Sequence, residues 1–264
     1  MVLNFIQWDV NPVIFELGPF QVRWYGLLFA MAFVLGYIVF KKIFNKEGHT
    51  IEMLDQLTVY LAIGTIIGAR LGHVLFYDPG YYFAHPLKIL AIWEGGLASH
   101  GSAIGMLVAL YLWARKNKQP YLWLLDRIGI VVALGGMCVR LGNLMNSEIY
   151  GIPTSMPWGF IFVRENEILP KHPTQIYEAL SYLAIFGFLF YSYTKEWLFN
   201  KRGLAFGIFL ILLFSARFLI EFIKNPQEDF EKGMPLMMGQ ILSIPFIVAG
   251  IILVFYALRK SAKS

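Results

Sequence analysis

The chain has 264 residues, of which 58% are hydrophobic and 15% are charged, and its formal net charge at pH 7 is +5. These values exclude a soluble globular domain, because a chain of this length could not bury so many apolar side chains. The basic residues stand in short clusters between apolar segments, which favours a role in membrane orientation and argues against nucleic acid as a partner. We therefore expect an integral membrane protein.

Seven segments are expected to cross the membrane as helices. A helix needs about 20 mostly apolar residues to cross roughly 30 Å of hydrocarbon. The predicted fold class is thus all-α, with seven transmembrane helices in a single domain that covers residues 1 to 264. The expected spans lie near residues 20 to 40, 57 to 76, 95 to 114, 121 to 139, 176 to 194, 204 to 223 and 236 to 257.

The loops between these spans alternate in charge, which predicts the direction of the chain. Dense basic clusters follow the first, third, fifth and seventh spans, with the sequences KKIFNK, RKNK, TKEWLFNKR and RKSAK. The segments DPGYYFAHPLKI and KNPQEDFEKG, on the other side, are mixed or acidic. Because cytoplasmic loops are enriched in Lys and Arg, we expect an outside (periplasmic) N-terminus and a cytoplasmic C-terminus. The longest loop, about residues 140 to 175, would then be a polar region outside the membrane.

Several polar side chains are expected at one depth in the outward half of the membrane. Arg70 and Arg217 each lie six residues from the outer end of a predicted span, hence roughly 9 Å deep. His100 lies about 8 Å deep by the same reasoning, Tyr25 opens the first span and Arg140 closes the fourth. A charged side chain in hydrocarbon costs a few kcal/mol or more. We interpret this layer, to which five helices contribute, as a pocket open to the outer leaflet.

Structural roles remain open for these residues. Arg70 could join helices together with His73, and Arg217 could pair with Glu221 one turn later. Arg140 could simply extend to the membrane interface. The shared depth and the excess of cations over carboxylates favour an anionic ligand instead, and the most available anion is a phospholipid phosphate. A guanidinium suits phosphate because its planar fork binds two oxygens through parallel hydrogen bonds.

The sequence indicates no metal and no cofactor. The five histidines lack HExxH or other metal-ligand spacing, and there is no GxSxG, Walker A or GxGxxG motif in a strand-turn-helix setting. Cys138, the single cysteine, is expected to be a small buried apolar residue and not a nucleophile. Imidazole readily accepts a proton near neutral pH, so His100 is a candidate base, with packing as the alternative.

Six blocks of the sequence, in the same order, resemble the bacterial prolipoprotein diacylglyceryl transferases. The most specific is CVRLGNLMNSEIYG, which begins at Cys138 and resembles the signature G-R-x-G-N-x-x-N-x-E-x-x-G, with Val139 in place of the first Gly. The resemblance runs from about residue 20 to 225, and the family's seven spans agree with the expected fold. The other blocks are RWYG (23 to 26), GARLGHVLFY (68 to 77), WEGGLASHG (93 to 101), HPTQIYE (172 to 178) and RFLIEF (217 to 222).

The resemblance implies a transferase of the bacterial inner membrane. Its reaction moves the diacylglyceryl group of phosphatidylglycerol to the lipobox cysteine thiol of a prolipoprotein, which forms a thioether and releases glycerol 1-phosphate. Two guanidiniums would take the place of a metal. By matching position, the expected catalytic residues are Arg140, Arg217, His100 and Tyr25, with the choice of base between the last two open. The expected phosphatidylglycerol-binding residues are Arg140, Arg217, Asn143, Asn146, Glu148, Arg70 and Glu221.

The chain departs from the family pattern at two positions. Leu213 stands where a Tyr is common, and Lys224 stands where an Arg is common, which keeps the charge but loses the bidentate fork. Two other functions are weighed. A phospholipid or anion transporter or flippase with a cationic outer-leaflet pocket would need a polar inward route, but the cytoplasmic halves of the first, third and sixth spans are nearly uniformly apolar. A membrane scaffold would leave several arginines at one depth unexplained.

Overall fold

The computed structural model describes residues 5–18, 20–92, 95–96, 98–227 and 231–261. Its contacts form two compact units, and each is described by itself. Unit 1 comprises residues 1–39 and 126–264, and unit 2 comprises residues 40–125. Trp93, Glu94 and Leu97, in one of the blocks that carry the family resemblance, lie outside the described residues, as do 228–230 in the acidic loop.

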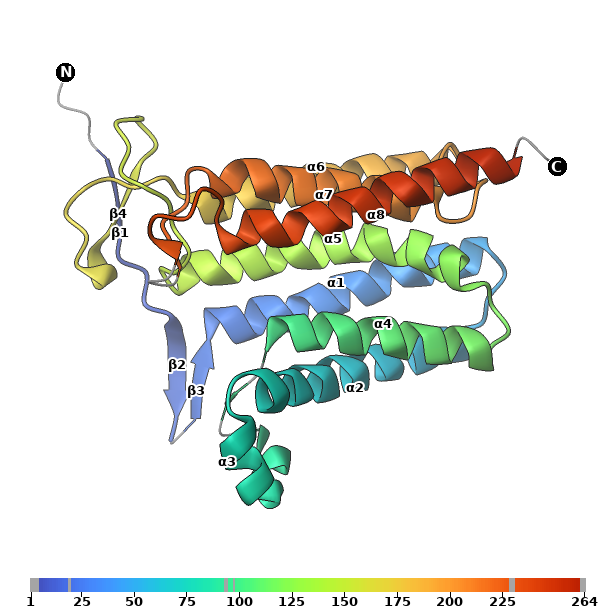
Figure 1. Cartoon of the computed structure of the whole chain (residues 1–264), viewed down its shortest axis with the longest axis horizontal. Coiled ribbons are helices and arrows are strands. Elements are labelled where there is room, and N and C mark those ends of the chain that lie inside the picture. The colour runs from blue at the N-terminus through green and yellow to red at the C-terminus, as the bar shows by residue number, and fades with distance from the viewer. Residues whose placement is uncertain (1–4, 19, 93–94, 97, 228–230, 262–264) are drawn as a thin grey trace. The chain divides into compact units, whose positions relative to one another are not determined.

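Long helices occupy each of the seven expected regions (Figure 1). Within the described part of the chain, six of them (α1, α2, α5, α6, α7 and α8) are long and apolar enough to cross a membrane. Helix α4 has 18 residues and carries polar residues at both ends, which lowers its mean hydropathy. The bounds are α1 Trp24–Lys46, α2 Ile51–Phe76, α4 Ser99–Lys116, α5 Tyr121–Met145, α6 Thr174–Thr194, α7 Leu204–Glu221 and α8 Met238–Ser261.

Several expected helix boundaries are wrong. Helix α2 begins at Ile51, not near residue 57, and α4 begins at Ser99, not near residue 95. Helix α1 begins at Trp24, not near residue 20, and it continues through the KKIFNK cluster. Helix α5 ends at Met145, so Arg140 and Asn143 lie inside it and not in the following turn. The C-terminal ends of α1 and α5 extend further than expected for the same reason. Polar residues mark where a helix leaves the hydrocarbon, but its backbone hydrogen bonds continue beyond that point.

The all-α expectation omits two small sheets in unit 1. Strands β2 (Val13–Leu17) and β3 (Phe20–Arg23) form an antiparallel hairpin directly before α1. Strand β1 (Ile6–Trp8) pairs in parallel with β4 (Phe160–Phe162), with Ile6 opposite Phe160. These segments lie outside the apolar runs, where extended backbone must pair to satisfy its polar groups. The loop between α5 and α6, called the outer loop after its expected side, is thus folded against the N-terminal segment and is not an open connection. It also contains the short 3-10 helix η3 (Val163–Glu165).

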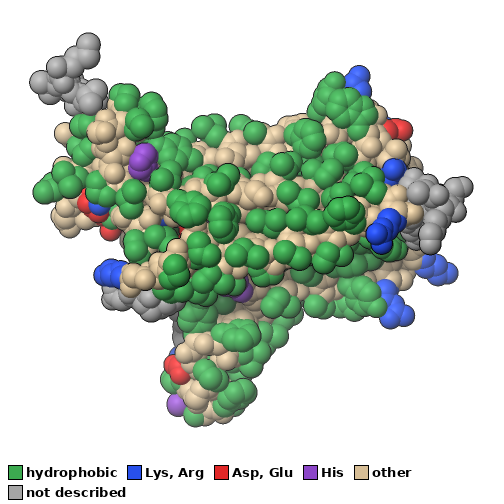
Figure 2. All heavy atoms as spheres, turned by 45° about the horizontal axis from the view of Figure 1, so that its top comes forward, with side chains coloured by type: hydrophobic (Ala, Val, Ile, Leu, Met, Phe, Trp, Pro, Cys, Tyr) green, Lys and Arg blue, Asp and Glu red, His purple; other side chains and the backbone are tan. Residues whose placement is uncertain are grey.

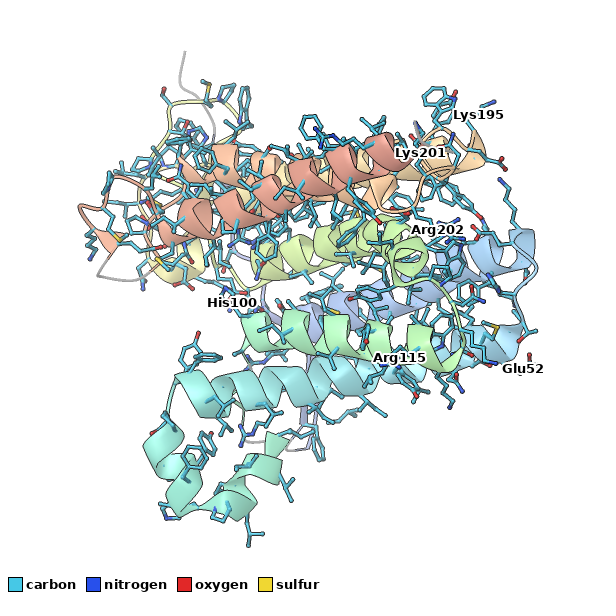
Figure 3. The ribbon with its side chains drawn as sticks, turned by 45° about the vertical axis from the view of Figure 1, so that its right-hand side comes forward. Glu52, His100, Arg115, Lys195, Lys201 and Arg202 are labelled. Carbon is cyan, nitrogen blue, oxygen red and sulfur yellow. The ribbon has the colours of Figure 1, made fainter. Side chains whose placement is uncertain are left out.

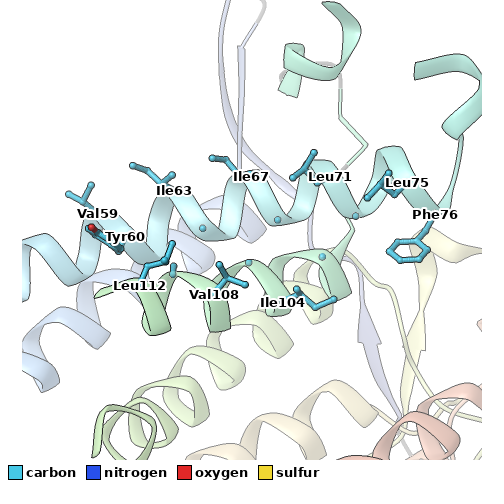
Figure 4. Close-up of a pocket in the computed structure, with 16 residues that line it drawn as sticks. Val59, Tyr60, Ile63, Ile67, Leu71, Leu75, Phe76, Ile104, Val108 and Leu112 are labelled. Atoms are coloured by element: carbon cyan, nitrogen blue, oxygen red, sulfur yellow. The ribbon is translucent and has the colours of Figure 1, made fainter. Parts of the chain in front are cut away.

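In unit 2, glycines bring α2 and α4 into backbone contact. A Cβ added at Gly68 or Gly105 would meet backbone atoms of the opposite helix, so larger residues could not pack there. Beside this contact runs a groove of about 610 Å³ (Figure 4), lined by side chains such as Ile63, Ile67 and Val108. None of the described residues that line it is charged, so the groove suits hydrocarbon and not phosphate. Helix α3 (Pro79–Ala84) and the 3-10 helix η1 (Pro86–Leu90) follow α2.

Apolar side chains cover the outer faces of the helices (Figure 2). Val34, Ile67, Leu180, Leu219 and Ile252, on five different helices, are between 53% and 65% exposed. Hydrocarbon is the solvent in which such faces are stable, whereas water would penalise them. The chain is a multi-pass membrane protein.

Charged side chains gather at the helix ends. In unit 1, Lys195, Lys201 and Arg202 lie in the connection between α6 and α7 (Figure 3). In unit 2, Arg115 lies in the last turn of α4, whereas His100 lies in the first turn, at the other end of that helix (Figure 3).

Candidate functional site

Four ionic side chains of unit 1 form a continuous series, Arg140–Glu178–Lys224–Glu221, which we call the ion-pair chain. Three of them are buried, and that of Arg140 is 12% exposed. Arg140 Nε lies 3.0 Å from Glu178 Oε2. Lys224 Nζ lies 3.0 Å from Glu178 Oε1 and 3.1 Å from Glu221 Oε2. The side chains of Glu178 and Lys224 are 0% and 2% exposed. Cations and carboxylates therefore alternate, and each Glu178 oxygen faces a different cation.

The two contacts of Glu178 differ in kind. Lys224 donates a hydrogen bond to Oε1, whereas Oε2 accepts none among the described residues, although Arg140 Nε is within ion-pair distance. The Arg140 Nε–H therefore does not point well at the carboxylate. Arg140 Nη1 donates to Asn143 Oδ1 over 3.2 Å. A guanidinium has five N–H groups, so Arg140 retains donors for a ligand.

The turn after α5, Asn146–Gly151, is held by hydrogen bonds from side chains of α5 and of the turn itself. Asn143 Nδ2 donates to Glu148 Oε1 over 2.7 Å, and Asn146 Nδ2 donates to the same oxygen over 3.3 Å. Asn146 Oδ1 is buried and accepts no hydrogen bond from the described part of the chain. Glu148 itself is exposed. The expected residues Asn143, Asn146 and Glu148 thus form one hydrogen-bonded group beside Arg140.

Two residues of this turn are in the left-handed region without being glycine. The φ of Ser147 is 56° and that of Ile149 is 62°. A β-branched residue in this region is an outlier, and such strain costs on the order of 1–3 kcal/mol. Thr174 Oγ1 donates to the Ile149 carbonyl over 2.8 Å, and Gln175 Nε2 donates to the Glu148 carbonyl over 2.7 Å. The buried start of α6 therefore imposes the shape of the turn.

Gly151 links this turn to the residues around Lys224. It forms an antiparallel bridge with Lys224, and Ile152 N donates to the Ile223 carbonyl over 2.9 Å. A Cβ at Gly151 would meet that carbonyl and would also lie 2.8 Å from His172 Cβ. Only glycine allows this approach. Backbone contacts therefore hold the signature segment, which ends at Gly151, against the segment that contains Lys224.

Arg217, on α7, is a cation without an ionic partner among the residues that the structure describes. Its side chain is partly buried, and its guanidinium makes no hydrogen bond or ion pair with any residue that the structure describes. The alternative of a pair with Glu221 is not found, because Glu221 binds Lys224 instead. The Tyr182 phenol is buried and interacts electrostatically with both Arg140 and Arg217. The charges of both arginines therefore act on one side chain.

Tyr25 lies in the first turn of α1, beside the signature. A Cβ at Gly142 would be 2.8 Å from Tyr25 Cδ2, so this glycine makes room for the ring. The phenol is partly buried and interacts electrostatically with Glu148 and Arg140. Tyr25 thus belongs to the same group of residues as the ion-pair chain. Cys138, one turn before Gly142, is fully buried, as its expected packing role requires.

Arg70 and His100, the two expected site residues in unit 2, have different surroundings. Arg70 is buried, and its guanidinium donates to the carbonyls of Lys88, Ile89, Gly95 and Gly96. Its charge also lies 4.9 Å from the centre of the Tyr82 ring. Most donors of Arg70 are therefore used to hold the connection between α2 and α4. His100 is exposed in the first turn of α4 (Figure 3).

Outside the spans, the folded outer loop contains a second, smaller polar group. Tyr150 Oη donates to Glu167 Oε1 over 2.9 Å, and Lys171 Nζ lies 3.1 Å from Glu167 Oε2. Burial and the neighbouring carboxylate raise the pKa of Tyr150 to about 12. Burial also lowers the pKa of His172, whose Nδ1 lies 3.1 Å from Tyr177 Oη. Both shifts favour the neutral side chains near the turn.

The sequence reasoning assigned no role to Glu178 or Tyr182. Glu178 is the last residue of the HPTQIYE block, and its place in that block could have indicated a role in the site. Lys224 was noted only as a departure from an expected arginine. All three belong to the observed site, because Glu178 and Lys224 are members of the ion-pair chain and Tyr182 interacts electrostatically with both arginines.

These features define an integral membrane protein that holds a buried ionic site, with an unpaired guanidinium, among apolar helices. The sequence matches the family model described as prolipoprotein diacylglyceryl transferase over residues 12–256. The chain belongs to this family, which confirms the resemblance, and it is a transferase.

Relatives from several bacteria are similar over nearly their full lengths. A phosphatidylglycerol–prolipoprotein diacylglyceryl transferase of Tolumonas auensis is 49% identical and covers 97% of this chain and 99% of its own. Proteins of the same name from Chloroherpeton thalassium and Porphyromonas gingivalis are each 47% identical and cover 98% and 97% of this chain. They cover 96% and 95% of their own lengths. The range matched by the family model, residues 12–256, spans the site described above.

Proposed function

We propose that this chain transfers the diacylglyceryl group of phosphatidylglycerol to the lipobox cysteine of a prolipoprotein. The cysteine sulfur attacks the glyceryl carbon that carries the phosphate, so an S–C bond forms and a C–O bond breaks. The bonding electrons leave with the phosphate oxygen of glycerol 1-phosphate, and the thiol proton passes to a base. The observation that carries this proposal is the unpaired Arg217 guanidinium beside the buried ion-pair chain, in a chain of this family.

The arginines supply the electrostatic part of the reaction. The leaving phosphate gains charge as the C–O bond breaks, and fixed guanidiniums stabilise that charge without reorganising water. Arg217 binds the phosphate of phosphatidylglycerol, and Arg140, which acts on the same Tyr182, adds its remaining donors. Asn143, Asn146 and Glu148 form the edge of the site. Glu221 contributes to phosphatidylglycerol binding indirectly, because it pairs with Lys224. Arg70 contributes indirectly as well, because it holds the connection between α2 and α4.

Two side chains are proposed as alternative bases for the thiol. A free thiol has a pKa of about 8.5, so removal of its proton accelerates attack. Tyr25 is supported by its place beside Glu148 and Arg140, and His100 by its exposed imidazole. Tyr25→Phe and His100→Gln separate them. The variant that lacks the base should lose its kcat and recover part of it as the pH is raised, whereas the other should keep the wild-type pH profile.

The proposed setting is the bacterial inner membrane, with seven crossings and the site towards the periplasm. The N-terminus would be outside, the C-terminus cytoplasmic, and α4 the crossing additional to the six apolar helices. The basic clusters support this direction. In a Cys138→Ala background, a cysteine at Glu165 should react with a membrane-impermeant maleimide in intact spheroplasts. A cysteine at Lys201 should react only after lysis, and the opposite pattern would overturn the orientation.

The transferase reaction is tested with purified protein, phosphatidylglycerol and a lipobox peptide. Glycerol phosphate should be released only when the peptide carries its cysteine, and the peptide should gain the mass of a diacylglyceryl group. Release with a peptide that carries Ser instead of Cys would contradict the proposal. Movement of intact phospholipid across the membrane, without a shortened lipid product, would indicate the transporter or flippase instead.

A further inference from the structure

Tyr182, on α6, is buried and packs against α5 beside the ion-pair chain. A Cβ at Gly136 would lie 3.0 Å from Tyr182 Cδ2, so this glycine leaves room for the ring. Arg140 follows Gly136 by one turn of α5, and Glu178 precedes Tyr182 by one turn of α6. Arg140 and Glu178 are themselves in contact. Because helical side chains point towards the N-terminal end of their helix, the Tyr182 phenol is directed at the Arg140 guanidinium.

The phenol of Tyr182 has one hydrogen-bonding position filled and one open. It shares a side-chain hydrogen bond with Arg140, which is the donor because a guanidinium has no acceptor. The O–H of the phenol is accepted by no residue that the structure describes. Glu178, four residues earlier, is the nearest carboxylate on this helix, but its Oε2 accepts no hydrogen bond in the described part of the chain. A buried O–H without an acceptor is unfavourable, so a ligand atom is expected to accept it.

We propose that Tyr182 is a further phosphate-binding residue: Arg140 holds its oxygen, and its O–H donates to a non-bridging oxygen of the phosphatidylglycerol phosphate. The inference rests on the proposed function. Arg140 and Arg217, the proposed phosphate ligands, are the two cations whose charges act on this phenol. Cations beside a hydroxyl oxygen turn its hydrogen away from themselves and towards a negative group. The Glu178 oxygens already face Arg140 and Lys224, whereas a bound phosphate would supply free lone pairs.

A neutral donor suits the phosphate on both sides of the reaction. The lipid phosphodiester carries one negative charge, and the leaving glycerol phosphate carries about −1.5 to −2 at pH 7. Because the electrons of the broken C–O bond pass to the phosphate, a hydrogen bond from Tyr182 strengthens towards the transition state. It therefore raises kcat as well as affinity. Tyr182 keeps its proton throughout, and the thiol proton still passes to the separate base.

The first test is Tyr182→Phe, which removes the hydroxyl group and keeps the ring beside Gly136. We expect kcat to fall on the order of 10- to 100-fold, and the Kd for phosphatidylglycerol without peptide to rise about two- to tenfold. Tyr191→Phe is the matched control, because Tyr191 lies on the same helix with an exposed side chain. Thermal unfolding in detergent checks that both variants keep the fold. Wild-type kcat and Kd in Tyr182→Phe would overturn the proposal.

A phosphorothioate lipid separates direct contact from an effect through Arg140. Each of its two diastereomers replaces one non-bridging oxygen by sulfur, which is a weaker hydrogen-bond acceptor. The wild type should prefer the oxygen lipid over one diastereomer, and this preference should shrink about tenfold in Tyr182→Phe. A role limited to positioning Arg140 would leave the preference for both diastereomers unchanged, which would contradict the proposed hydrogen bond.

A second replacement keeps the test decisive if Tyr182→Phe does not fold. Replacement of Tyr182 by 3-fluorotyrosine keeps the hydroxyl group and makes its O–H a stronger donor. The preference for the oxygen lipid over the same diastereomer should then increase. An unchanged preference would overturn the proposal.

The outcomes separate this inference from the proposed function. If the wild type releases no glycerol phosphate in a thiol-dependent way, the proposed function fails. The Kd comparison needs no turnover, so equal Kd values for phosphatidylglycerol in the wild type and in Tyr182→Phe would overturn the role of Tyr182 in that case too. If the wild type is active and Tyr182→Phe matches it in kcat and Kd, only the inference fails.

Discussion

Gly239, in the first turn of α8, lies directly against the carboxylate of Glu221 at the end of α7, so close that a Cβ at this position would overlap the carboxylate. The positive end of the α8 dipole also faces that carboxylate, which stabilises its negative charge. Glu221 in turn binds Lys224. The packing of α7 against α8 is therefore part of what holds the ion-pair chain in place.

The Gly239→Ala variant should displace Glu221 and weaken its bond to Lys224. We expect the free energy of unfolding to fall by about 1–3 kcal/mol, as for other overpacked sites, together with a loss of transferase activity. Thermal unfolding in detergent and the glycerol phosphate assay measure the two effects. Gly187→Ala is the matched control, because nothing lies within 4 Å of its added Cβ. Equal behaviour of both variants would contradict the role of Gly239.

Arg217 and Arg140 should differ in what their loss does to stability. Arg217→Gln should lower kcat on the order of 100- to 1000-fold, the range for loss of a transition-state donor, with little change in Tm. Its guanidinium has no ionic partner in the described part of the chain, so no protein charge is left unpaired. Arg140→Gln should lower both activity and Tm, because Glu178 loses one of its two cations. Similar Tm losses in both variants would show that Arg217 has a structural partner.

Lys224 should tolerate arginine but not an apolar residue. Lys224→Arg keeps a cation between Glu178 and Glu221, so we expect activity within a few-fold of wild type. Lys224→Met leaves two buried carboxylates without their shared cation, and removal of one partner from a buried pair costs about 3–5 kcal/mol. Chemical unfolding of the two variants side by side measures the difference. Equal stability would mean that the carboxylates find other partners.

Acidification should destabilise the outer loop through His172. Burial lowers its pKa in the folded protein below the unfolded value of about 6.5. The contribution of the neutral His172 ring to the free energy of unfolding is therefore fully present above about pH 6.5 and is lost as the pH falls below that value. Tm should decrease between pH 7.5 and 5.5 in the wild type and less in His172→Gln. An identical slope in both proteins would remove His172 as the cause.

The sequence was sufficient to locate the long helices, because apolar runs near the span length leave few other folds. It was also sufficient to predict that Arg140, Asn143 and Glu148 belong to one site, because they are close in the chain. It did not predict the role of Glu178, since burial between two cations depends on how α5, α6 and the end of α7 pack. Arg70 shows the same limit. Its depth in the helix is readable, but the carbonyls that it binds belong to a connection 18 to 26 residues further along.

The parallel pairing of β1 with β4 has a consequence for the order of assembly. Ile6 and Phe160 are partners, yet 153 residues separate them in the chain. Bacterial ribosomes add about 5–20 residues per second, so the N-terminal strand waits roughly 10–30 s before its partner exists. Contacts between such distant residues also form slowly. The outer loop, and with it the strained turn beside Arg140, should therefore mature last, after the first four long helices have been synthesised.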